Sequence, residues 1–198
     1  MARRLILIRH GEVEAHRAGR FLGSTDAALA PAGLRQAAGL APYLAAKRPG
    51  ACFSSPLQRC TATARAAVAG LLLPLQVDPD LREVDFGAWE GLSFAEIAGR
   101  DAATVDRWAR FEPDFRFPGG ESVAAFIGRV GAAAERMAAA PQETVVAFTH
   151  GGVIRFMLCG LLRLAPRSYG AFEVRPAAVA ELALFDGGAL LQFLGEVA

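Results

Sequence analysis

Two histidine-glycine pairs are the residues of this chain best suited to chemistry, and each directly follows an apolar run. Arg9-His10-Gly11 comes after Leu5–Ile8, and His150-Gly151 comes after a run over residues 144–149. An imidazole can act as a nucleophile or a general base. A neighbouring guanidinium can bind phosphate oxygens through paired, charge-assisted hydrogen bonds. These residue types therefore point to phosphate chemistry.

Neighbouring strands would have to position both histidines. Continuous apolar runs are typical of parallel strands buried on both faces, and open α/β sheets bind ligands at the carboxyl ends of their strands. If the strands over 5–8 and 144–149 are adjacent and parallel, both imidazoles lie at one crevice. Strands that alternate with helices predict an α/β fold, a three-layer α/β/α sandwich around a mostly parallel central sheet. Residues 179–185 and 190–194 predict a closing hairpin.

A third basic residue follows another predicted strand, over residues 51–54. The sequence after it predicts a capping box with Ser55 as N-cap, Pro56 at N1 and Gln58 at N3. Arg59 would then lie in the first turn of a helix, where its charge adds to an amino-terminal end that favours anions. Helix position alone favours a solvated surface arginine, but the other motifs of the chain favour an anion-binding role for Arg59.

The remaining segments predict helices and a lid. Pro31 fits a first helical position, and Leu34, Ala37, Ala41 and Leu44 fall on one face of a helix of about four turns. Residues from about 84 to 120 have two short helical patterns and several aromatic residues, which predicts a small helical lid inserted over the sheet. A strongly amphipathic helix is expected from about residue 121. The whole chain, residues 1–198, is predicted to be one domain.

Composition limits the function further. The chain has 198 residues, of which 53% are hydrophobic and 21% charged, with a formal net charge of +1. A folded protein is expected, and no overall charge favours nucleic acid or an anionic membrane, so any anion site must be local. The three cysteines and three histidines have no metal-ligand spacing. The apolar run before Arg9 is too short for a signal peptide. We expect a cytoplasmic protein without a metal or cofactor.

Four motifs then occur in a fixed order along the chain. They are Leu7-Ile8-Arg9-His10-Gly11-Glu12, Ser54-Ser55-Pro56-Leu57-Gln58-Arg59, Leu81-Arg82-Glu83-Val84-Asp85-Phe86-Gly87 and Thr149-His150-Gly151-Gly152. Together they resemble the histidine phosphatase superfamily, whose fold is phosphoglycerate mutase-like. The segments Trp89-Glu90-Gly91 and Phe117-Pro118-Gly119-Gly120-Glu121-Ser122 look like its phosphatase branch, and particularly like the α-ribazole phosphatases. Ala30 stands where the family often has Ser or Thr, which predicts a helix that lacks its side-chain cap, at a cost of about 1 kcal/mol.

The resemblance implies a role for each site residue. It implies His10 as the nucleophile that takes the phosphoryl group, with Arg9, Arg59 and His150 around the phosphate oxygens. It implies Glu83 as the general acid, where chemistry alone would also allow Asp85 or Glu90. Substrate contacts are expected from Gly11, His16, Leu22, Gly23 and Gly151. His16 stands where the family often has Asn, and it is as well explained as a loop histidine.

The expected function is a metal-independent phosphomonoester hydrolase that forms a phosphohistidine on a small phosphorylated metabolite, with α-ribazole 5′-phosphate as a candidate substrate. A phosphoglycerate mutase and a non-catalytic phosphate-ligand binder on the same fold are the alternatives, and a binder would not need a nucleophile. No nucleic-acid or membrane partner is expected, and a homodimer is left open. The sequence does not identify the leaving group, which the lid and the loop Gly19–Asp26 should decide.

Overall fold

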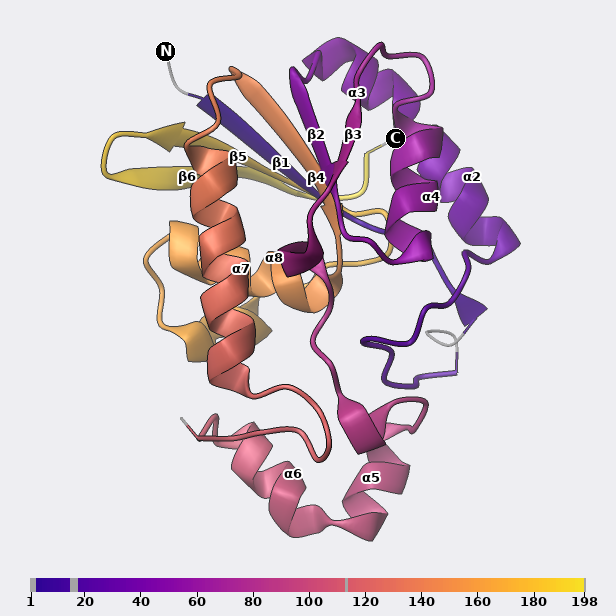
Figure 1. Ribbon diagram of the computed structural model, residues 1–198, viewed down its shortest axis with the longest axis vertical. Helices are drawn as coiled ribbons and strands as arrows, with labels where there is room; N and C mark the ends of the chain where they lie inside the picture. The colour runs from indigo at the N-terminus through magenta and orange to yellow at the C-terminus, as the bar shows by residue number, and fades with distance from the viewer. Residues whose placement is uncertain (1–2, 15–17, 113, 198) are drawn as a thin grey trace.

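The central sheet places the ends of two parallel strands next to each other. The computed structural model describes residues 3–14, 18–112 and 114–197, and these form a six-stranded sheet in the order β3-β2-β4-β1-β5-β6 (Figure 1). The strands are β1 (Arg3–Arg9), β2 (Ala51–Ser54), β3 (Leu75–Val77), β4 (Thr144–Thr149), β5 (Val179–Phe185) and β6 (Gly188–Gly195). The first four are mutually parallel, whereas β5 and β6 form an antiparallel hairpin beside β1. The predicted α/β fold and closing hairpin are confirmed.

The register between β1 and β4 matters most for the site. Ile8 pairs with Phe148 and Arg9 pairs with Thr149, so both strands end at the same level. Each strand is buried on both faces over its apolar run. The residues that follow, His10 and His150, therefore emerge side by side, as the sequence predicted.

Helices cover both faces of the sheet, because successive side chains of a strand point to opposite sides. Ile6 and Ile8 belong to one core cluster with residues of α2 (Pro31–Gly39), α3 (Ala41–Lys47) and α4 (Gln58–Ala67) or of the turns beside them. Leu5 and Leu7 belong to another, with residues of α7 (Val123–Ala138) and α8 (Gly151–Leu161). Figure 1 shows these two groups of helices on either side of the sheet.

The predicted four-turn helix after Pro31 is wrong in one respect, since it is broken into α2 and α3 at Leu40. Pro42 has no N–H to continue the helical ladder, and its ring would clash with the carbonyl one turn earlier. The break also changes the buried face. Gly33, Ala37, Leu40 and Leu44 are buried, whereas Leu34 is 52% exposed. As predicted from Ala30, α2 begins without a side-chain cap.

The capping box predicted at Ser55 is also wrong. Helix α4 begins at Gln58 with Leu57 as N-cap and no side-chain cap from that residue. The carboxylate of Asp26 instead accepts a hydrogen bond from the Gln58 N–H at 2.8 Å. The Ser55 hydroxyl is therefore not required for the helix and is available to the site.

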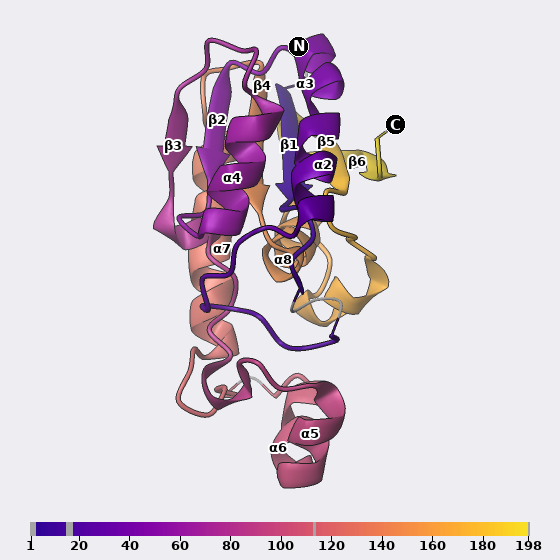
Figure 2. The same cartoon turned by 90° about the vertical axis from the view of Figure 1, so that its right-hand side faces the viewer.

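The lid consists of short helices beyond the carboxyl ends of β1 and β4, as Figure 2 shows. It contains the 3₁₀ helix η2 (Gly87–Trp89), α5 (Phe94–Arg100) and α6 (Ala102–Ala109); two further 3₁₀ helices, η1 (Pro79–Leu81) and η3 (Pro166–Ala171), lie outside it. Packing of Trp89 against Trp108 and Phe117, with ring centroids 5.5 and 5.3 Å apart, holds the lid together. The N–H of Phe21 donates to the Leu92 carbonyl at 2.8 Å and so ties the loop Gly19–Asp26 to the lid.

Candidate active site

The two predicted imidazoles meet at the carboxyl ends of β1 and β4. Their ring centroids are 5.1 Å apart at an angle of 65°. His10 is 2% exposed and His150 is fully buried. The backbone N–H of His10 donates to the Thr149 carbonyl at 2.9 Å, which extends the strand pairing into the site. The structure therefore brings together the two histidines that the sequence placed far apart.

A backbone contact selects the tautomer of His10. Its Nδ1 lies 2.7 Å from the carbonyl oxygen of Gly11. A carbonyl oxygen can only accept, so Nδ1 carries a proton, and in a neutral ring the lone pair is then on Nε2. Gly11 must be a glycine here, because a Cβ at this position would lie 2.4 Å from the backbone oxygen of Gly33. The close approach of these two glycines fixes the turn that holds His10.

The surroundings of His150 keep its ring neutral. Nε of Arg59 donates to His150 Nδ1 at 3.3 Å, and His150 Nε2 lies 2.8 Å from the Ser55 hydroxyl. Since a guanidinium can only donate, Nδ1 is the acceptor and Nε2 carries the proton. Burial lowers the pKa of His150 well below its ordinary value, and the charge of Arg59 lowers it further. His150 is thus a neutral hydrogen-bonding group at neutral pH.

Arg59 is fully buried and links α4 to the loop Gly19–Asp26. Its Nη1 donates to the Thr25 carbonyl at 2.7 Å and its Nη2 to the Gly23 carbonyl at 2.7 Å. Burial lowers the pKa of the guanidinium. Each Nη nitrogen has a second N–H, so the fork can hold the loop and still offer donors to an anion. The interpretation of Arg59 as a solvated surface residue is wrong.

Arg9 contributes a second guanidinium near the imidazoles. Its Nη1 donates to the Val174 carbonyl at 2.7 Å. Its guanidinium lies against the first residue of α8, because a Cβ on Gly151 would be 3.4 Å from Cζ and from Nε of Arg9. Burial lowers the pKa of Arg9, whereas the nearby charge of Glu83 raises it. The fully buried guanidinium of Arg59 and the partly buried one of Arg9 thus both lie near the histidines.

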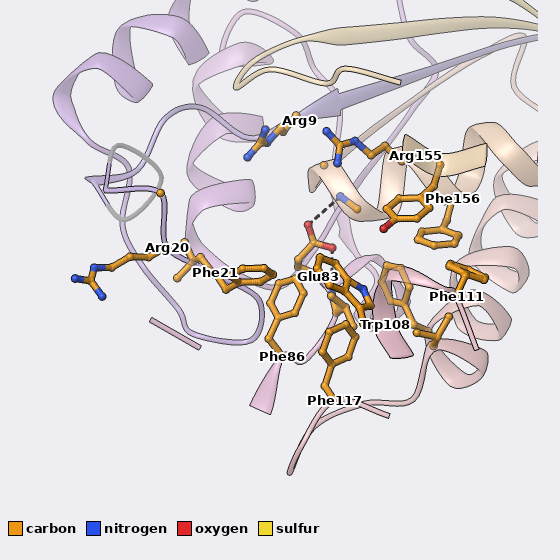
Figure 3. Close-up of a pocket in the computed structure, with 18 residues that line it drawn as sticks. Arg9, Arg20, Phe21, Glu83, Phe86, Trp108, Phe111, Phe117, Arg155 and Phe156 are labelled. Atoms are coloured by element: carbon orange, nitrogen blue, oxygen red, sulfur yellow. Dashed lines mark hydrogen bonds between the residues drawn. The ribbon is translucent and has the colours of Figure 1, made fainter. Parts of the chain in front are cut away.

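The carboxylate of Glu83 lies at the amino-terminal end of α8. It accepts from the Gly152 N–H at 3.0 Å and from its neighbour's N–H, that of Val84, at 3.1 Å (Figure 3). A Cβ at Gly152 would lie 2.4 Å from Oε1 of Glu83, so only a glycine allows this approach. A negative charge is favoured at a helix amino terminus.

The other two carboxylates that could serve as the acid, Asp85 and Glu90, accept hydrogen bonds from the loop Gly19–Asp26. Asp85 accepts from the Ser24 hydroxyl at 3.1 Å and the Gly87 N–H at 2.9 Å. Glu90 accepts from the N–H groups of Gly23 and Ser24 at 3.0 and 2.9 Å. Both carboxylates hold the loop against the lid. Of the three, Glu83 alone contributes to the lining of the cavity described next.

A cavity of about 420 Å³ opens beside this site. Arg9, Glu83, Gly151 and Gly152 line one end, and eight aromatic side chains line much of the remainder (Figure 3). Among the predicted substrate contacts, Leu22 and Gly151 line this cavity. The N–H of Gly11 donates to the Thr63 hydroxyl at 3.0 Å. The N–H of Gly23 donates to the Glu90 carboxylate, and the Gly23 carbonyl accepts from Arg59. His16 lies outside the described residues.

Comparison with known proteins identifies the family. Residues 5–196 match the histidine phosphatase superfamily (branch 1). The chain belongs to this superfamily. It is 31% identical over 170 residues to phosphoserine phosphatase 1 of Hydrogenobacter thermophilus, covering 85% of this chain and 81% of that protein. The fold matches that of the α-ribazole phosphatase from Shigella flexneri with a TM-score of 0.89 and 27% identity, over 97% of this chain and 96% of that one.

A longer relative also matches. The chain is 41% identical over 158 residues to the bifunctional protein Rv2228c of Mycobacterium tuberculosis, which is 78% of this chain but 43% of that protein. The chain therefore spans less than half the length of this relative. Within the described residues of this superfamily member, every helix is too short or too polar to cross a lipid bilayer.

Sequence reasoning missed two arginines and most of the aromatic cavity wall. Arg155 lines the cavity, and Arg129 binds the backbone of the segment that carries Glu83. A signal for Arg155 was available, because it lies one helical turn after Gly151 and therefore on the same face of α8. The cavity wall could not be predicted from the sequence, because its residues come from the loop Gly19–Asp26, the lid, α7, α8 and η3.

Proposed function

We propose that this chain is a phosphomonoester hydrolase that works through a phosphohistidine on His10 and needs no metal ion. The observation that carries the proposal is the hydrogen bond between His10 Nδ1 and the Gly11 carbonyl at 2.7 Å. It leaves Nε2 as the nitrogen with the lone pair, beside Arg59, His150 and Arg9. A neutral, oriented imidazole within a cluster of fixed donors is what an attack on a phosphate ester requires.

In the first step, His10 Nε2 attacks phosphorus. The P–N bond forms as the ester P–O bond breaks, and Glu83, protonated for this step, gives its proton to the departing oxygen. Each oxygen of that carboxyl accepts one N–H in the structure and keeps a lone pair that a proton can occupy. Arg9, Arg59 and His150 stabilise the charge that spreads over the phosphoryl oxygens.

In the second step, water attacks the phosphohistidine. The Glu83 carboxylate takes one proton of the water, the P–N bond breaks, and inorganic phosphate leaves with His10 neutral again. Glu83 thus acts as acid and then as base. The same residues and order of steps would serve a mutase if a second substrate hydroxyl replaced the water.

The substrate is a small phosphorylated metabolite, and α-ribazole 5′-phosphate is the first candidate. Support comes from the agreement with the Shigella flexneri α-ribazole phosphatase over 97% of this chain. The test is to incubate the protein with α-ribazole 5′-phosphate, phosphoserine, 3-phosphoglycerate and p-nitrophenyl phosphate and to analyse the products. A hydrolase releases inorganic phosphate, a mutase returns an isomeric ester, and a non-catalytic binder returns the ester unchanged.

A further inference from the structure

Arg59 carries a positive charge deep in the protein without a carboxylate next to it. It is fully buried, and within the part of the chain that the structure describes its nitrogens donate to His150 and to the backbone carbonyls of Gly23 and Thr25. A buried charge is costly unless an opposite charge or polarised groups compensate it. What stabilises the two carbonyls therefore also decides where the guanidinium is held.

The carboxylate of Glu90 binds the other side of the same loop. Its Oε1 accepts from the N–H groups of Gly23 and Ser24 at 3.0 and 2.9 Å, and its Oε2 accepts from the N–H and the hydroxyl of Thr25 at 3.3 and 2.7 Å. Three successive backbone N–H groups that converge on one anion form an anion nest. Glu90 directly follows η2 and its buried Trp89, so the lid places this charge.

One peptide group connects Glu90 to Arg59. In the peptide between Gly23 and Ser24, the carbonyl accepts from Nη2 of Arg59 at 2.7 Å and the N–H donates to Glu90. Hydrogen bonds in a chain polarise one another, so the negative charge of Glu90 makes this carbonyl a stronger acceptor for the guanidinium. Burial lowers the pKa of Arg59, and the charge of Glu90 is among those that act in the opposite direction.

The loop has little freedom to move between these two groups. A Cβ at Gly23 would overlap the carbonyl oxygen of Val84 and would lie 2.5 Å from Oε1 of Glu90. On the side of α4, the carboxylate of Asp26 accepts from the Gln58 N–H, and the Gln58 side chain donates to the Asp26 carbonyl, each at 2.8 Å. A change at Glu90 is therefore transmitted to the carbonyls that hold the guanidinium.

Resting on the proposed function, we propose that Glu90 is a positioning residue for phosphoryl transfer, whose carboxylate holds the Arg59 fork in place through residues 23–25. Among the described residues, the cavity lining includes Glu83 but not Glu90. The effect of Glu90 thus falls on the phosphoryl group, which all substrates share, and not on the leaving group. This separates Glu90 from a general acid, whose effect depends on how strongly the leaving group needs a proton.

Glu90→Gln tests this role by its pattern across substrates. Glutamine keeps the size of the side chain but removes the negative charge and turns one acceptor into a donor. We expect kcat/KM for p-nitrophenyl phosphate and for phosphoserine to fall by the same factor, at least about tenfold. The Kd of inorganic phosphate, measured by calorimetry, should rise at least about fivefold. This constant does not depend on how much of the protein is folded.

Glu96→Gln is the matched control. Glu96 also joins the lid to the loop, through an exposed ion pair with Arg20 at 3.2 Å, and it forms a capping box with Ser93 that a glutamine can keep. The same substitution there should leave the kinetics and the binding of phosphate as in the wild type. Similar losses in both variants would show that any weakening of the lid lowers activity, and would overturn the specific role of Glu90.

A double-mutant cycle with Arg59→Lys tests the path of the effect. If Glu90 acts through Arg59, adding Glu90→Gln to Arg59→Lys should lower kcat/KM by less than about a further twofold, whereas independent effects multiply. Losses that multiply would overturn the inference, as would unchanged kinetics in either single variant. A loss in Glu90→Gln that is much larger for phosphoserine than for p-nitrophenyl phosphate would make Glu90 a proton donor and would also overturn it.

Failure of the proposed function would look different. In that case the wild-type protein would release phosphate from no ester, including p-nitrophenyl phosphate. The Kd of inorganic phosphate would still test the link between Glu90 and Arg59, since binding requires no turnover. An unchanged Kd in Glu90→Gln would then overturn the inference.

Discussion

Arg129 donates from Nη2 to the backbone carbonyl oxygen of Glu83 at 3.0 Å. Its Nη1 donates to the carbonyls of Asp80 and Arg82 at 2.8 and 2.6 Å, and the carboxylate of Glu121 accepts from Nε at 2.8 Å. One guanidinium from α7 thereby fixes three carbonyls of the segment that carries the proposed acid. Because Arg129 holds the backbone of this segment in place, the side chain of Glu83 can point toward the amino terminus of α8.

Arg129→Lys should therefore act through Glu83. A lysine keeps the charge but cannot reach three carbonyls and a carboxylate with a planar fork. We expect kcat for an alkyl phosphate to fall about tenfold, and kcat for p-nitrophenyl phosphate to fall less, because a good leaving group needs less protonation. Arg136→Lys, on the same helix but in an exposed ion pair, is the control. A parallel loss on both esters would show that Arg129 has a general structural role only.

The parts of this site that the sequence predicted depend on short-range patterns. Leu5–Ile8 and the run over residues 144–149 are strands because nearly every side chain is apolar, and parallel strands end at one edge of a sheet. That is sufficient to bring His10 and His150 together. The motif resemblance favoured Glu83 over Asp85 and Glu90, and of these three Glu83 alone lines the cavity. What Asp85 and Glu90 bind could not be predicted.

The parts that could not be predicted depend on partners distant in the chain. The stretch from Ser55 to Gln58 fits a capping box locally. In the fold, however, the Ser55 hydroxyl contacts His150 Nε2, and the Asp26 carboxylate accepts the Gln58 N–H at the start of α4. The contacts of Arg129 join α7 to the segment that carries Glu83, two elements that no local pattern connects. The break at Leu40 is different, because Pro42 signals it in the sequence itself.

Arg59→Lys tests the buried fork beside His150. Lysine would keep one positive charge but would lose the paired bonds to the Thr25 and Gly23 carbonyls and the contact with His150. We expect kcat/KM for p-nitrophenyl phosphate to fall at least about tenfold, equivalent to roughly 1.4 kcal/mol of transition-state stabilisation. Arg65→Lys, an exposed position on the same helix, should behave as wild type. Unchanged kinetics in Arg59→Lys would exclude Arg59 from the transition state.

The pH dependence of stability should report His150. Its pKa in the folded protein is well below the ordinary value of 6.5, so the unfolded chain binds more protons between these two values. Stability is fully present above about pH 6.5 and is lost as the pH falls through this window, by at most about 1.4 kcal/mol per pH unit. The Tm of the wild type should fall more steeply between about pH 6.5 and pH 5 than that of His150→Gln. Parallel curves would mean that His150 titrates equally in both states.

Chelation tests whether the positive charge of the side chains is sufficient for catalysis. Because Arg9 and Arg59 supply the charge that a metal ion supplies in other phosphoryl-transfer sites, EDTA should leave hydrolysis of p-nitrophenyl phosphate nearly unchanged. The rate is measured before and after EDTA treatment and again after Mg²⁺, Mn²⁺ or Zn²⁺ is added. A loss of activity that one of these ions restores would contradict the metal-independent mechanism.

Glu83→Gln separates the two chemical steps. The nucleophile remains, so the variant should still form the phosphohistidine from p-nitrophenyl phosphate, whose leaving group needs little protonation. The second step should be slow, because glutamine cannot take a proton from the attacking water, and phosphohistidine should therefore accumulate. The phosphohistidine is acid-labile, so the mixture is quenched in base and the phosphate on His10 is located by mass spectrometry. His10→Ala is the control and should show neither turnover nor label. If Glu83→Gln lost aryl and alkyl esters equally and trapped no intermediate, Glu83 would not be the acid, and Asp85 and Glu90 would have to be tested by the same experiment.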